Sequence, residues 1–92
     1  MLDINNYYER LVSDHLWKLI ESGEQTMSQT FLEDVACLAL NQLPVCYVRS
    51  HVDKSSDLSD ADYQRMTDAV AVAIEAAIAK VQQRPHDNRE TD

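Results

Sequence analysis

The chain of 92 residues contains a single glycine, Gly23, and only two prolines, Pro44 and Pro85. Tight turns and close backbone approach to a phosphate both depend on glycine, so phosphate-binding loops, dinucleotide fingerprints and strained nucleophile turns are excluded. So few turn-forming residues are typical of a helical protein. With 45% apolar residues the chain can bury a core, and its length allows one domain.

The first predicted helix runs from about Asn5 to Ser22. Apolar residues recur there at spacings of three and four, which indicates one buried face. Gly23 follows as the residue that ends the helix. The predicted stripe consists of Ile4, Tyr8, Leu11, Val12, Leu16, Leu19 and Ile20.

The second predicted helix begins at Thr30, where Thr30 and Glu33 form a capping box, and ends near Leu43 before Pro44. Apolar residues cover much of its circumference, so we expect it to be central and buried. Residues 45–48 are apolar and β-prone, which predicts a short extended connector packed on the core or a strand in an oligomer.

The third predicted helix follows a polar loop over residues 50–58. Ser59 and Asp62 form its capping box, and it continues to about Gln83. Two apolar stripes run along it, more than one short helix can cover, so we expect a homodimer. The first stripe is Met66, Val70, Ala73, Ala77 and Val81, and the second is Ala69, Val72, Ala76 and Ala79.

The sequence therefore predicts an all-α fold, a small bundle of about three main helices with a short extended connector after the second. We expect the helical domain to span residues 1–84. Residues 85–92 contain no apolar residue to bury, which predicts a disordered C-terminal tail.

Charge and hydropathy restrict the partners. Eight Lys and Arg against 16 Asp and Glu give a net charge of −8, which repels DNA and RNA. The apolar stretches are too short to cross a bilayer, and the N-terminus lacks the features of a signal peptide. We therefore expect a cytoplasmic protein that does not act at a membrane.

Three groups of residues suggest chemistry, and each has a simpler explanation. Consecutive helical residues point about 100° apart, so Ser13, Asp14 and His15 cannot converge as a catalytic triad, and we expect no enzyme. Zinc could be bound by Cys37, Cys46, His51 and His86, but no two of them are three or four positions apart, as a ligand pair on one helix would be. Free, buried cysteines are therefore favoured over a metal site. Four aspartates superficially suggest calcium, but the EF-hand loop pattern is absent and helix capping already accounts for two of them; they are Asp57, Asp60, Asp62 and Asp68.

The segment from Asp34 to Val48 resembles the late-competence protein ComFB family, whose members carry a D-V-x-A-L-A-L-N-x-L-P-P-x-Y-V-like pattern. Val45 stands in place of the second proline and Cys37 in place of the first alanine. An N-x-x-E-x-x-V-like helix at residues 6–12 and the spacing of Ala77, Val81 and Pro85 extend the likeness. The matching residues are Asp34, Val35, Leu40, Asn41, Leu43, Pro44 and Tyr47.

The resemblance implies a small helical homodimer. Some relatives bind zinc through a C-x-C-x-x-C cluster before the matching aspartate; residues 24–30 contain no cysteine here, so we expect no metal and no cofactor. Certain relatives are receptors for cyclic di-GMP, which makes nucleotide signalling the sharpest functional hypothesis.

A site for this ligand needs a cation for phosphate, a hydrogen-bonding edge for guanine and a stacking plane. Arg49, Tyr47 and Asn41 are the candidate ligand-binding residues. Simpler roles stay open: Asn41 bonding carbonyls at its helix end, Tyr47 in the core, and Arg49 paired with an acid. Two functions therefore remain, a cyclic di-GMP receptor and a dimeric adaptor for an unknown protein partner.

Overall fold

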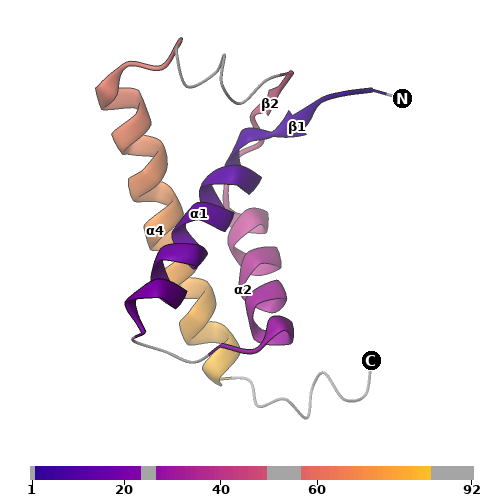
Figure 1. Ribbon diagram of the computed structural model, residues 1–92, viewed down its shortest axis with the longest axis vertical. Helices are drawn as coiled ribbons and strands as arrows, with labels where there is room; N and C mark the ends of the chain where they lie inside the picture. Colours follow the sequence, from indigo (N-terminus) through magenta and orange to yellow (C-terminus); the bar gives the residue numbers. More distant parts are fainter. Residues whose placement is uncertain (1, 24–26, 50–56, 84–92) are drawn as a thin grey trace.

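Three helices and a two-stranded ribbon make up the computed structural model, which describes residues 2–23, 27–49 and 57–83. The elements follow the order β1 (Asn5–Asn6), α1 (Tyr7–Ser22), α2 (Gln29–Gln42), β2 (Tyr47–Val48) and α4 (Asp60–Gln83). Figure 1 shows the ribbon at the end of the bundle where α1 begins and α2 ends. The prediction of a bundle with three main helices and a connector after the second is confirmed.

The core lies where the three helices meet. Each helix contributes residues three or four positions apart, as amphipathic helices do. The buried apolar residues are Tyr7, Tyr8, Leu11, Val12 and Leu16 of α1, Val35 and Ala39 of α2, and Val70, Ala73, Ile74, Ala77 and Val81 of α4.

Helix α1 begins two residues later than the periodicity predicts. Asn5 and Asn6 pair with Val48 and Tyr47 in antiparallel register and so form a strand. The predicted stripe is wrong at both of its ends, because Ile4 precedes the helix and is exposed, and Ile20 is exposed as well. At the C-terminal end, Gly23 adopts φ 72° and its N–H donates to the carbonyl oxygen of Ile20, as the sequence predicts.

Helix α2 differs from the prediction at its start and in its burial. Ser28, not Thr30, caps the helix, because the Ser28 hydroxyl oxygen accepts the N–H of Phe31 at 3.1 Å. Thr30 lies within the first turn. Only Val35 and Ala39 are fully buried, so α2 is one side of the bundle and not its centre.

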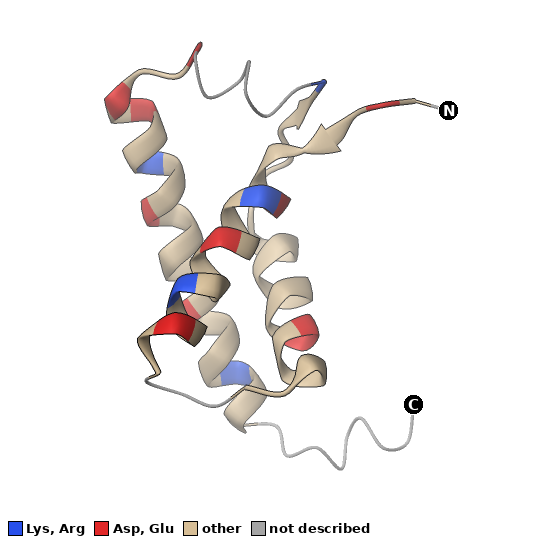
Figure 2. Ribbon diagram, in the orientation of Figure 1, with Lys and Arg blue, Asp and Glu red and all other residues tan. Residues whose placement is uncertain are grey.

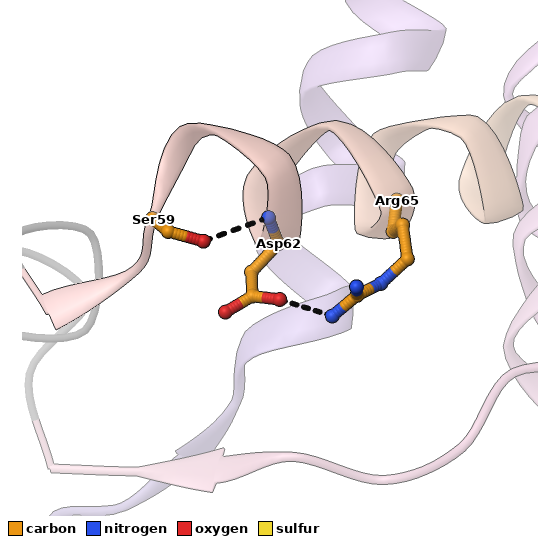
Figure 3. A network of polar contacts seen from close by, with 3 residues as sticks. All are labelled: Ser59, Asp62 and Arg65. Carbon is orange, nitrogen blue, oxygen red and sulfur yellow. Dashed lines mark hydrogen bonds and ion pairs between the residues drawn. The ribbon is translucent and has the colours of Figure 1, made fainter.

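Helix α4 begins as predicted. The Ser59 hydroxyl oxygen accepts the N–H of Asp62 at 3.0 Å, and Asp60 and Asp62 lie in the first turn, where the helix dipole favours negative charge. Figure 3 shows that the Asp62 carboxylate accepts a hydrogen bond from Arg65 one turn later. Of the predicted loop and tail, residues 50–56 and 84–92 lie outside the described ranges.

The two apolar stripes of α4 have different surroundings. The first faces α1 and α2, with Met66 half-buried and its other members buried. In the second stripe Val72, Ala76 and Ala79 are exposed. None of the helices in the described ranges is both long and apolar enough to span a membrane.

Candidate functional site

Two of the three predicted ligand-binding residues lie at strand β2: Tyr47 is in the strand, and Arg49 directly follows it at a bend. Tyr47 is 63% exposed and Arg49 is exposed, whereas Val48 between them is half-buried. The difference between Tyr47 and Val48 follows from the strand period of two. We call Tyr47 and Arg49 the β2 platform.

Strand β1 lies beside the β2 platform. The register pairs Asn5 with Val48 and Asn6 with Tyr47. Ile4, the residue before β1, is exposed. The strand is held inside one chain, and the predicted alternative of a strand in an oligomer is not needed to explain it.

Asn6 fastens the ribbon to the start of α1. Its side-chain oxygen Oδ1 accepts the N–H of Tyr8 at 3.2 Å and the N–H of Cys46 at 2.9 Å. The N–H of Tyr7 donates to the Cys46 carbonyl oxygen at 2.7 Å. Sequence reasoning assigned no role to Asn6, although an asparagine before an amphipathic run is a typical N-cap.

Tyr8, in the first turn of α1, is a buried core residue. Burial raises the pKa of Tyr8 above its ordinary value of 10.0, because the phenolate is less well solvated there. Charge repulsion from Cys46 adds to the rise of this pKa, and the positive charge of Arg65 opposes it. Tyr8 is therefore a neutral phenol at physiological pH.

The third predicted residue, Asn41, lies in a different element from the β2 platform. It is exposed in the last turn of α2. The N–H of Leu43 donates to the carbonyl oxygen of Leu40 at 3.3 Å, so a backbone N–H, and not the Asn41 amide, satisfies this carbonyl at the helix end. Asn41 precedes the platform along the chain, and its amide faces solvent.

The cations of the described segments differ in their partners. Arg10 Nε lies 3.4 Å from Asp14 Oδ2, and Arg65 pairs with Asp62. Arg49 has no acidic partner within the described ranges. Residues 35–48, which precede Arg49 in the chain, contain no Lys, Arg, Asp or Glu, and Figure 2 shows no charged residue over this stretch.

A groove of about 440 Å³ lies between α2 and α4. Its lining is mainly apolar, with small side chains from α4, and includes three polar side chains. The lining residues are Leu38, Gln42, Ala73, Ala76, Ala77, Ala79, Lys80 and Gln83. The groove includes two of the exposed residues of the second α4 stripe, Ala76 and Ala79, and none of the residues of the β2 platform.

The groups that suggest catalysis or metal binding are dispersed. Asp14 pairs with Arg10 one turn earlier on α1. Cys37 is exposed, which contradicts its prediction as a buried thiol: α2 buries Val35 and Ala39, and Cys37 between them points to the opposite side. Cys46 is half-buried. His51 and His86 lie outside the described residues, and the described ones contain no group of three metal-ligating side chains.

Comparison with known proteins identifies one family. Among curated proteins and among solved structures, no match was found. Residues 5–85 match the family described as Late competence development protein ComFB, so the match covers α1, α2, α4 and the ribbon. The chain therefore belongs to the ComFB family of competence-related regulatory proteins.

Proposed function

We propose that this protein is a non-enzymatic cytoplasmic receptor that binds cyclic di-GMP on the β2 platform and passes the signal to a protein partner. The observation that carries the proposal is the exposure of both Tyr47, in a hydrogen-bonded strand, and Arg49, which directly follows that strand. A ring and a guanidinium two residues apart offer a guanine base a stacking surface and a phosphate a cation.

The surroundings of each residue support this role. Tyr47 is too exposed to act as a core residue, and Arg49 keeps its guanidinium available because no described acid pairs with it. Asn41 offers a donor and an acceptor that suit a guanine edge.

Symmetry links the ligand to a dimer. Cyclic di-GMP has two guanines and two phosphates, and a homodimer presents each platform twice about a two-fold axis. The net charge of −8 opposes a dianionic ligand, so a local cation at the site is necessary. Arg49 meets that need at the end of an uncharged stretch of chain.

A second candidate function is a dimeric adaptor that binds protein partners without a nucleotide. The groove between α2 and α4 favours it, because a mainly apolar lining with a few polar side chains resembles the composition of protein interfaces. In this case the β2 platform has no nucleotide ligand.

Calorimetric titration with cyclic di-GMP separates the two functions. We expect the wild-type protein to bind and Arg49→Ala to lose about 1.5–3 kcal/mol of binding free energy, the range for hydrogen bonds to a charged group. Arg10→Ala is the matched control, because it removes the same charge from α1, where Arg10 pairs with Asp14. We expect its affinity to be unchanged.

Tyr47→Ala refines the same experiment. A side chain that is 63% exposed contributes little to the core. We therefore expect weaker binding with a change in unfolding free energy below about 1 kcal/mol. A wild-type protein that gives no heat with cyclic di-GMP would leave the adaptor as the better hypothesis.

A further inference from the structure

Asn6 joins two elements through one buried oxygen. The residue is 8% exposed, and its Oδ1 accepts both the Tyr8 N–H of α1 and the Cys46 N–H that precedes β2. We propose that Asn6 is the positioning residue of the β2 platform, holding Tyr47 and Arg49 in the geometry that binds the ligand. This inference rests on the proposed function.

The attachment is strong because both backbone groups of one residue, Cys46, form hydrogen bonds to this segment. Cys46 donates its N–H to Asn6 and receives the N–H of Tyr7 on its carbonyl oxygen, at 2.9 and 2.7 Å. Tyr47 follows directly in the chain and pairs with Asn6 across the ribbon. The backbone of Tyr47 is thereby held against the first turn of α1, where Tyr7 and Tyr8 are buried in the core.

The chemistry requires an amide at this position. A serine caps a helix almost as well as an asparagine, but its hydroxyl lies one bond closer to the backbone and cannot serve the Tyr8 and Cys46 donors together. An aspartate has the same reach, but it places a negative charge beneath a platform for an anionic ligand. Asn6 combines reach, acceptor capacity and neutrality.

Loss of the shared oxygen frees β2 without unfolding the bundle. Each strand of the ribbon has two residues, and such a short pair is not stable alone. A platform that moves before binding must be ordered during binding, and this ordering weakens the affinity. Asn6→Ser should therefore retain the cap of α1 and lose the position of β2.

The test compares Asn6→Ser with Ser28→Ala in the full-length protein. Ser28→Ala removes the cap of α2, a similar hydrogen bond that holds no strand. We expect amide hydrogen exchange at Cys46 to become at least about tenfold faster in Asn6→Ser and to stay within about threefold of wild type in Ser28→Ala; a tenfold change corresponds to ~1.4 kcal/mol. We expect cyclic di-GMP affinity to fall about tenfold in Asn6→Ser alone.

The outcomes separate this inference from the proposed function. If wild type binds cyclic di-GMP and Asn6→Ser binds as tightly, the positioning role is wrong and the receptor function stands. If wild type does not bind, the receptor function fails, and exchange at Cys46 still decides whether Asn6 holds β2. Equal exchange at Cys46 in wild type and Asn6→Ser overturns the inference in either case.

Discussion

Tyr8 couples the stability of the protein to alkaline pH. In the unfolded chain its phenol ionises near 10.0, whereas in the folded protein burial raises the pKa of Tyr8 above that value. The folded state therefore holds the proton longer than the unfolded state. The contribution to stability is complete below pH 10.0 and is lost as the pH rises through the raised pKa.

Urea unfolding of Tyr8→Phe tests this linkage. We expect wild type to lose more unfolding free energy than Tyr8→Phe between about pH 8 and about pH 11, because the variant has no phenol to ionise. Tyr47→Phe is the control, since it removes a hydroxyl from an exposed ring. A wild-type loss equal to that of Tyr8→Phe would contradict the assignment.

At the scale of single elements, the end of α1 depends on the backbone conformation of Gly23. Its φ of 72° is open to glycine and costs other residues energy, although a side chain there meets no atom within 4 Å. We expect Gly23→Ala to lower the unfolding free energy by roughly 1–2 kcal/mol through backbone strain alone.

Gly23→Asn provides the matched control for that prediction. Asparagine tolerates the left-handed conformation better than alanine, so we expect the asparagine variant to lose less stability in urea unfolding. The reverse order of the two variants would show that something other than backbone strain governs this helix end.

At the scale of the whole molecule, the exposed stripe of α4 and the adjoining groove favour a homodimer. Val72 is 69% exposed, and Ala76 and Ala79 beside it line the groove with Leu38 of α2. Small side chains permit close approach of helices, so a second copy can pack on this face. We expect sedimentation to give a dimer at micromolar concentration.

Ala76→Glu tests which face forms the dimer. A carboxylate buried at a two-fold interface meets its own copy and loses its hydration, so we expect this variant to be monomeric while remaining helical. Ser13→Glu is the control, because it adds the same charge to an exposed position of α1. A monomeric wild type, or a dimeric Ala76→Glu, would contradict this interface.

The helices follow from local sequence. Glycine at the end of α1, serine at the start of α4 and proline after α2 act within a few residues of themselves, so the number and approximate extents of the helices could be predicted. The start of α2 was misplaced because Ser28 and Thr30 are both good caps, and only the hydrogen bond to Phe31 distinguishes them.

The functional surface, in contrast, depends on contacts between distant segments. The sequence shows that Tyr47 and Arg49 are two residues apart in a β-prone segment, but the strand ends at Val48, and the exposure of both residues required the bundle to leave them uncovered. The pairing of β2 with Asn5 and Asn6 has no local signal, since the Cys46 to Asn6 bond joins residues 40 positions apart. Helical signals are local hydrogen bonds and periodicities, so the chain encodes them element by element; the ribbon, its anchor at Asn6 and the exposed face of α4 exist only after three helices have packed.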